Sequence, residues 1–203
     1  SMIYDSMIFT LISVGGLLTL KIDLIMLSWM TSIENVAIYG VSQKIISQFE
    51  MLRGIILTAF FPVVIKRIKR GNISLKKIQK ITGIIFIILF LLSLLLSYCS
   101  DFMFNIFYKQ EYQYSSEVFK VLIFYLALYY TTLPFTILIQ ASYMEKYLLY
   151  IYPFSITINI VLNYILFNKF GLLGIAYSTL AVRVFILIFM YLITITKLKR
   201  QVA

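Results

Sequence analysis

Six long apolar stretches constrain this chain more than any other feature of its sequence. They cover residues 3–30, 36–65, 81–100, 118–143, 147–167 and 172–196. A helix of about 20 apolar residues crosses the hydrocarbon core of a bilayer, which is about 30 Å thick. The chain is 62% hydrophobic and only 13% charged, so it has too few polar side chains to cover a soluble core. We therefore predict an all-α integral membrane protein in which residues 1–203 form a single bundle of six transmembrane helices.

The two longer connections between these stretches differ in charge. Residues 66–80 contain seven lysines and arginines and no acid, whereas residues 101–117 contain three acids and one lysine. Basic loops stay on the cytoplasmic side of a membrane, which places both termini and residues 145–146 in the cytoplasm as well. The formal net charge of +10 is thus interpreted as a topology signal, and no nucleic-acid partner is expected.

The residues that most enzyme and metal sites require are scarce. Histidine is absent and Cys99 is the one cysteine, which excludes histidine-assisted catalysis and most zinc sites. Neither a phosphate-binding P-loop nor a dinucleotide-binding glycine motif occurs. We therefore expect no catalytic residue, no metal site, no cofactor and no enzymatic activity.

A proline lies inside the fourth apolar stretch. Pro134 has no N–H and clashes with the preceding helical turn, and it is flanked by Thr131, Thr132 and Thr136. Threonine hydroxyls can hydrogen-bond the carbonyls that such a bend frees. The sequence predicts a bend at this point.

Charged residues within the apolar stretches are the most informative feature for function. An Arg, Lys or Asp at mid-membrane costs about 2.5–3.5 kcal/mol, so each needs a compensating partner. One helical face of the second stretch is polar and carries Gln43, Ser47 and Glu50, with Lys44 and Arg53 on its flanks. Glu50 and Arg53 can form an i,i+3 ion pair or contact a substrate.

Three other stretches also carry polar groups. Lys21 and Asp23 lie on nearly opposite faces of the first helix and need different partners. Asn159 and Asn163 share a face of the fifth, where interhelical packing is the simpler explanation. Arg183 has no acid at i±3 or i±4, so another helix, water or a substrate phosphate must hold it.

Cations outnumber acids inside the apolar stretches, which favours an anionic ligand such as a diphosphate. The candidate residues for substrate binding are Lys21, Lys44, Arg53, Arg183, Gln43 and Asn159. The candidates for ion coupling are Asp23 and Glu50.

Several runs of residues resemble one family of transporters. KIDLIML at 21–27, NVAIYG at 35–40 and Phe61-Pro62 are similar to the seventh and eighth helices of Wzx-type polysaccharide flippases. These belong to the multidrug/oligosaccharidyl-lipid/polysaccharide (MOP) exporter superfamily. NIVLNYIL at 159–166 and FGLLGIAYST at 170–179 resemble the eleventh helix and the start of the twelfth.

The resemblance implies one half of a two-bundle transporter. The chain corresponds to the C-terminal six helices, and the N-terminal half or a second copy would complete the cavity. The function implied is export of a lipid-diphosphate-linked, anionic oligosaccharide across the cytoplasmic membrane of a bacterium or archaeon. In that family the lipid tail stays in the membrane lipid while the headgroup crosses.

Three other functions remain open from the sequence. An ion-coupled small-molecule exporter of the same superfamily would use Asp23 and Glu50 for coupling. A membrane-embedded glycan-assembly enzyme, such as an O-antigen polymerase, would need a larger external loop than residues 101–117 provide. A non-transporting assembly subunit is the third.

Overall fold

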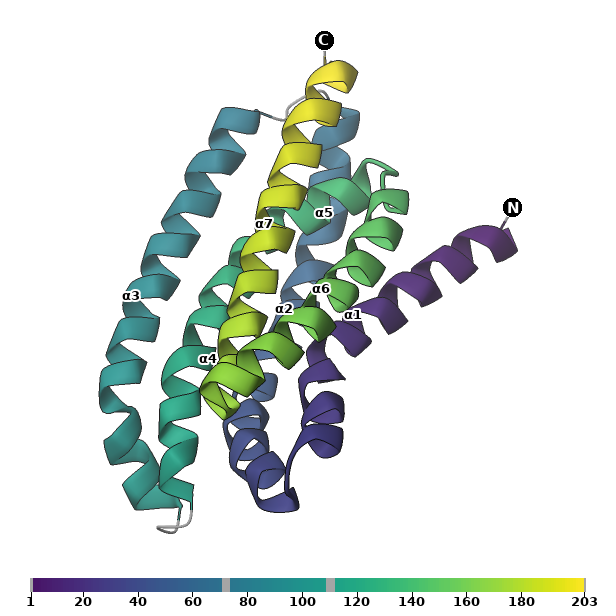
Figure 1. Cartoon of the computed structure of the whole chain (residues 1–203). Coiled ribbons are helices and arrows are strands. Elements are labelled where there is room, and N and C mark those ends of the chain that lie inside the picture. The colour runs from purple at the N-terminus through teal and green to yellow at the C-terminus, as the bar shows by residue number, and fades with distance from the viewer. Residues whose placement is uncertain (1, 71–73, 109–111, 203) are drawn as a thin grey trace.

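The computed structural model describes residues 2–70, 74–108 and 112–202, and these form helices joined by short connections, with no strand among them. The seven helices are α1 (Met2–Met30), α2 (Ile33–Lys69), α3 (Leu75–Phe107), α4 (Gln113–Thr131), α5 (Leu133–Ala141), α6 (Lys146–Phe170) and α7 (Leu172–Val202). They pack as a bundle in which the N-terminal end of α1 leans outward (Figure 1). The expected all-α architecture is present.

Among the residues that the structure describes, four helical segments are long and apolar enough to cross a membrane. They are Leu75–Phe107, Gln113–Ala141, Lys146–Phe170 and Leu172–Thr196. The segment Gln113–Ala141 combines α4 and α5. The structure is therefore consistent with a membrane protein, and it supports four spans where the sequence predicts six. Helices α1 and α2 are not among the four, and α2 carries Lys44, Glu50 and Arg53 along its length.

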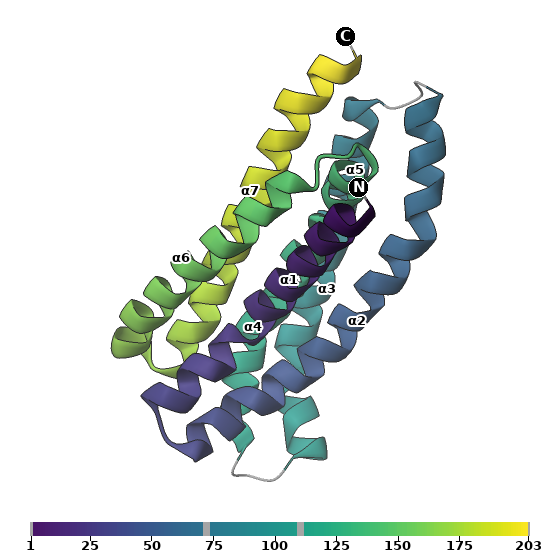
Figure 2. The ribbon, with the colours of Figure 1, turned by 90° about the vertical axis from the view of Figure 1, so that its right-hand side faces the viewer.

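The connections alternate between the two ends of the bundle. The α2–α3 connection, the α5–α6 turn and the C-terminus lie toward one end, and the α1–α2, α3–α4 and α6–α7 connections lie at the other (Figures 1 and 2). This is the grouping of loops that the charge pattern predicts. The helices are longer than the apolar stretches, so both predicted loops are shorter than expected; their middles, residues 71–73 and 109–111, lie outside the described residues.

The predicted bend occurs between α4 and α5. Helix α4 ends at Thr131, and α5 begins at Leu133 with Pro134 in its first turn. The hydroxyls of Thr131 and Thr132 donate to the backbone carbonyls of Ala127 and Tyr129 at 2.6 and 2.7 Å. The predicted bend is present. The threonine hydroxyls bond carbonyls of their own preceding turn rather than that of Tyr130, whose helical donor Pro134 removes.

Local sequence explains two of the tight turns. The Ser32 hydroxyl accepts a hydrogen bond from the Asn35 N–H and caps α2, as expected of a serine at this position. Gly171 separates α6 from α7 with φ +59°, a conformation that other residues rarely adopt. Three residues later, Gly174 packs directly against the backbone of Leu166.

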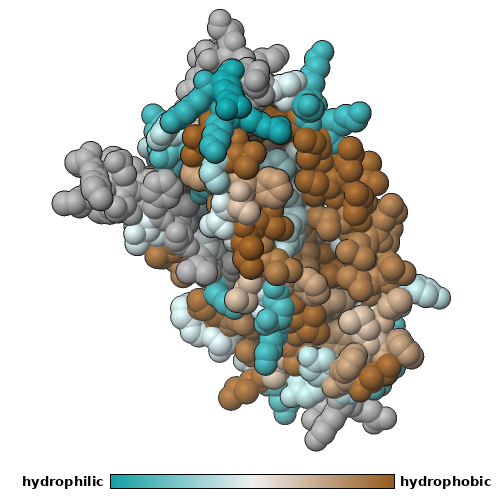
Figure 3. All heavy atoms as spheres, turned by 180° about the vertical axis from the view of Figure 1, so that it is seen from behind, coloured by the Kyte–Doolittle hydropathy of each residue, from teal (hydrophilic) through white to brown (hydrophobic). Residues whose placement is uncertain are grey.

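The apolar core consists of two clusters stacked along the bundle. One centres on α4 and includes Phe119, Leu122 and Ile175. The other joins α5, α6 and α7 and includes Ile139, Leu148 and Ile186. Helix α3 presents apolar side chains outward, including Ile88 and Leu95, which are 59% exposed. The flank on the side of α3 is accordingly hydrophobic (Figure 3), as expected of a surface that contacts lipid.

Candidate functional site: two buried polar clusters

Polar and charged side chains lie between the two apolar core clusters. Along α2, Arg53 falls between Ile46 of the first cluster and Val64 beside the second. Along α7, Arg183 falls between Ala176 of the first and Ile186 of the second. The bend of α4 and α5 occurs at the same level. The bundle therefore buries charge near its middle, where a bilayer solvates charge least.

Two arginines and two tyrosines form the first group, which we name the arginine–tyrosine cluster (Arg53, Tyr125, Tyr129 and Arg183). The guanidinium carbons of Arg53 and Arg183 lie 4.3 and 4.7 Å from the centre of the Tyr129 ring. Tyr129 stacks on Tyr125 with ring centres 5.5 Å apart. Arg183 also lies 4.9 Å from the Tyr125 ring. Aromatic faces thus provide cation–π stabilisation to both cations.

Hydrogen bonds connect this cluster to one acid and to the helix bend. Arg183 Nη2 donates to the Tyr125 hydroxyl at 3.0 Å, and that hydroxyl donates to Glu50 Oε1 at 2.8 Å. Arg53 Nη2 donates to the hydroxyls of Thr132 and Thr136 at 3.2 and 2.9 Å. Arg183 is therefore held by another helix, which is one of the three options that the sequence leaves open.

Neither arginine forms an ion pair among the described residues, where the salt bridges are those of Lys120 with Asp101 and Glu117. Arg53 is 9% exposed and Arg183 is 5% exposed. The Nε of each is buried and has no hydrogen-bond partner within the described part of the chain. The i,i+3 ion pair considered for Glu50 and Arg53 does not form, because the two side chains bond to different helices. The cluster therefore retains two unsatisfied Nε donors, and its link to an acid runs from Arg183 through the Tyr125 hydroxyl to Glu50.

A buried aspartate centres the second group, which we name the Asp23 network (Asp23, Tyr39, Asn159, Asn163, Ser178 and Thr179). Asp23 is 2% exposed. Its Oδ2 accepts from the Tyr39 hydroxyl at 3.1 Å and from the Thr179 hydroxyl at 2.6 Å. Its Oδ1 accepts from Asn163 Nδ2 at 3.0 Å. The carboxyl is held by neutral donors from three other helices.

The two asparagines extend this network across α6 and α7. Asn163 Nδ2 donates to Asn159 Oδ1 at 2.8 Å, and the Ser178 hydroxyl donates to Asn163 Oδ1. Asn159 is 2% exposed. The interhelical hydrogen bonding expected of these asparagines is present at Asn163. Asn159, a candidate for substrate binding, lies in the Asp23 network and outside the arginine–tyrosine cluster.

A small cavity of about 10 Å³ lies between the two groups. Its lining includes Asp23 and Tyr39 of the network, Tyr125 of the cluster, and Gln43 and Glu50. A polar cavity of this size accommodates about one water molecule. Asp23 and Glu50 therefore face a common polar space.

The remaining predicted cations, Lys21 and Lys44, belong to neither group. Lys21 and Lys44 are both exposed, whereas Gln43 is half-buried. Lys21 and Asp23 point into different surroundings, as their helical positions predict. Among the four predicted cations, the fold brings Arg53 and Arg183 together and leaves the lysines on the surface.

Sequence reasoning missed the tyrosines. Tyr125 and Tyr129 sit well inside an apolar stretch, where a headgroup anchor has no role, while Tyr39 lies near the start of another. Tyr125 and Tyr129 are also four residues apart, which places them on one helical face. Those two facts were the available signal, since a buried tyrosine hydroxyl usually has a polar partner.

No protein family, curated protein or solved structure matches this chain. The resemblance to Wzx-type flippases stays a prediction from the sequence.

Proposed function

We propose that this chain is one half of an exporter that flips a lipid-diphosphate-linked oligosaccharide across the cytoplasmic membrane for surface polysaccharide assembly. The observation that carries the proposal is the arrangement of Arg53 and Arg183. Both guanidinium groups are buried against Tyr129 without a carboxylate in ion-pair contact among the described residues. A diphosphate supplies the missing negative charge and accepts charge-assisted hydrogen bonds from the free Nε donors.

The proposal includes six membrane spans. In it, α1 and α2 cross the bilayer beside the four apolar segments, and their charges are shielded by the bundle or face the partner half. The partner is an N-terminal half or a second copy of this chain. In this arrangement the exposed side chains of Lys21 and Lys44 face the cavity between the two halves. The substrate keeps all of its covalent bonds.

Transport requires movement at this site. The two arginines are buried, so the headgroup reaches them only when α2 separates from α4 and α5. The hydrogen bonds from Arg53 to Thr132 and Thr136 would then break. Phosphate contacts that replace these bonds would stabilise the open state over the closed one, and this difference in binding energy would shift the equilibrium between the two states.

Asp23 is the better of the two candidates for ion coupling. It is the more buried acid, and the hydroxyl and amide groups around it suit a carboxyl that exchanges a proton or a monovalent cation. This feature also supports the second candidate function, an ion-coupled small-molecule exporter. If a cation binds there, Na⁺ should raise the unfolding temperature of the wild-type chain in detergent above that in K⁺, and Asp23→Asn should abolish the difference.

The central experiment measures glycan export beside membrane abundance in cells that carry the complete transporter. Arg183→Ala should abolish export with near-normal abundance, and Arg183→Lys should restore it only in part because the two-donor geometry is lost. Arg70→Ala is the matched control, because Arg70 is an exposed arginine at the end of α2. Wild-type export by Arg183→Ala would eliminate the headgroup role.

A structural role for Arg183 gives a different pattern. If Arg183 mainly holds helices together through Tyr125 and Glu50, Arg183→Ala should lower abundance. Neutralising the acid as well, in Arg183→Ala/Glu50→Gln, should then restore abundance. Export normalised to abundance separates the two roles.

A further inference from the structure

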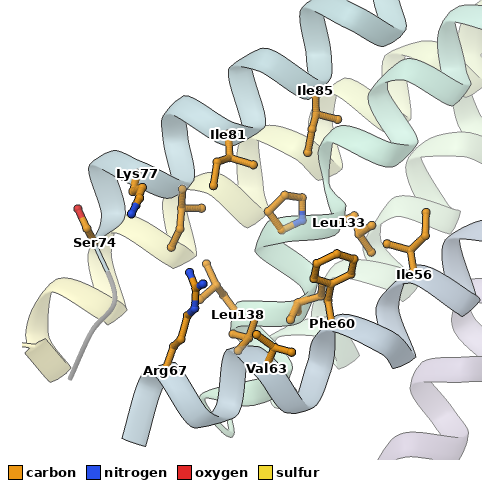
Figure 4. Close-up of a pocket in the computed structure, with 14 residues that line it drawn as sticks. Ile56, Phe60, Val63, Arg67, Ser74, Lys77, Ile81, Ile85, Leu133 and Leu138 are labelled. Atoms are coloured by element: carbon orange, nitrogen blue, oxygen red, sulfur yellow. The ribbon is translucent and has the colours of Figure 1, made fainter. Parts of the chain in front are cut away.

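A second feature, separate from the polar clusters, is a groove of about 360 Å³ between α2, α3 and α5 (Figure 4). Leu133, Ile137 and Leu138 of α5 contribute its buried apolar side. Phe60 of α2 and Ile81 of α3 form the walls, and they are 55% and 47% exposed. The groove therefore opens on the outside of the bundle, and its volume falls in the range of about 300–1,000 Å³ that is usual for ligand pockets.

Two cations mark one end of this groove. Arg67 at the C-terminal end of α2 and Lys77 in the first turns of α3 both line it, and their side chains point toward the same opening (Figure 4). Both are exposed, and neither has an ion-pair partner among the described residues. The site thus combines an apolar channel with a positive mouth.

The groove lies on a different stripe of α5 from the arginine–tyrosine cluster. Thr132 and Thr136 contact Arg53, while Leu133 and Ile137 line the groove. A ligand in the groove therefore does not meet the two buried arginines. Its occupant need not be the transported substrate.

We propose that this groove binds one anionic phospholipid of the bilayer, with a hydrocarbon chain against Phe60 and Ile81 and the phosphate between Arg67 and Lys77. Basic pockets between transmembrane helices bind anionic lipid headgroups, and each basic side chain near the membrane surface contributes about 1 kcal/mol. An apolar wall that is exposed in a bilayer meets lipid by default. The inference rests on α2 and α3 crossing the membrane, but not on the nature of the cargo.

The experiment measures lipid binding to the purified chain in detergent by native mass spectrometry. Phosphatidylglycerol and phosphatidylcholine with identical chains are the two probes. The wild-type chain should prefer phosphatidylglycerol. Each basic side chain contributes about fivefold in affinity, so Arg67→Gln/Lys77→Gln should lower the affinity for phosphatidylglycerol by about 25-fold. Lys69→Gln/Lys80→Gln removes two exposed charges near the same end that do not line the groove, and it should change affinity by less than about twofold.

A groove-filling variant tests the hydrocarbon part. Ile81→Trp should lower the affinity for both lipids, because the added ring occupies the channel. The preference for phosphatidylglycerol should remain, because the two cations are unchanged. Inorganic phosphate should not displace the lipid. Equal weakening by the two charge-removal pairs, equal affinity of the wild-type chain for both lipids, or unchanged binding to Ile81→Trp would overturn the proposal. Circular dichroism and size-exclusion elution establish that each variant is folded.

Discussion

The ring of Tyr129 contacts two guanidinium groups that form no ion pair among the described residues. A desolvated cation–π contact contributes about 2 kcal/mol, while each mid-membrane arginine costs about 2.5–3.5 kcal/mol on insertion scales. One such contact therefore offsets only part of the cost for Arg53, whereas Arg183 contacts two rings. Their hydrogen bonds to Tyr125, Thr132 and Thr136 supply further compensation, and an anionic ligand would complete it.

The Tyr125 hydroxyl links Arg183 to Glu50, and we expect Tyr125→Phe to lower stability by about 1–3 kcal/mol. Phenylalanine keeps the stacked ring, but it leaves a buried Arg183 donor and a Glu50 oxygen without their partner. Thermal unfolding in detergent measures the change. Tyr164→Phe, at a residue that is 62% exposed on α6, is the control and should unfold like the wild type. Equal unfolding temperatures for all three proteins would contradict the role of this hydroxyl.

Asp23 provides a second prediction at the level of one residue. Asp23→Leu removes the acceptors of Tyr39, Asn163 and Thr179, so several buried donors lose their partner at about 1–3 kcal/mol each. Asp23→Asn keeps one oxygen acceptor and should therefore lose less stability. We expect the unfolding temperature in detergent to fall in the order wild type, Asp23→Asn, Asp23→Leu. A leucine variant as stable as the wild type would show that these hydrogen bonds contribute nothing net.

At the level of elements, α6 and α7 pack closely because Gly174 has no side chain. A Cβ atom at this position would collide with the Leu166 carbonyl oxygen. The neighbouring turn at Gly171 has φ +59°, so the two glycines fix both the turn and the approach of the helices. Small residues that allow such approach are typical of helix pairs in membranes.

Gly174→Ala should therefore destabilise the bundle by about 1–3 kcal/mol, the usual cost of overpacking. Gly83→Ala is the matched control, because a Cβ there meets nothing within 4 Å. That variant should gain about 0.5–1 kcal/mol from its higher helix propensity. Unfolding midpoints in detergent compare the two. If both variants are more stable than the wild type, the close contact of α6 with α7 at Gly174 does not contribute to stability.

At the level of the whole molecule, charge differs between the two ends. The end formed by α2 and α3 carries exposed Lys66, Arg67, Lys69 and Lys77, whereas Asp101 and Glu117 pair with Lys120 near the other. Hydrophilic side chains gather at one end of the molecule above a largely hydrophobic flank (Figure 3). Such asymmetry orients a helical bundle in a bilayer with the basic end in the cytoplasm.

The expected topology can be tested with two exposed positions in a Cys99→Ser background. Ser74→Cys lies at the basic end and Gln113→Cys at the acidic end. A membrane-impermeant maleimide added to intact cells should label the cysteine at 113 and spare the one at 74, and lysis should make both reactive. Labelling of both positions in intact cells would rule out the proposed sidedness.

The sequence by itself determined the helical class, the bend at Pro134 and the grouping of connections at two ends. These features depend on local properties, namely the length of apolar stretches, the missing N–H of proline and the distribution of charge between loops. The sequence also identified Arg53, Arg183, Asp23 and Glu50 as charges that need compensation, because the cost of burying a charge depends on its position in an apolar stretch.

Only the tertiary structure decided which partners compensate those charges. Tyr125 lies 58 residues before Arg183, and Asn163 lies 140 residues after Asp23, so helical periodicity within one stretch gives no information about these pairs. The structure also separated the buried arginines from the exposed lysines Lys21 and Lys44, which composition treats alike. Long-range packing sets these contacts, since a side chain's partner across a helix interface depends on the crossing of two helices and not on the sequence around either residue.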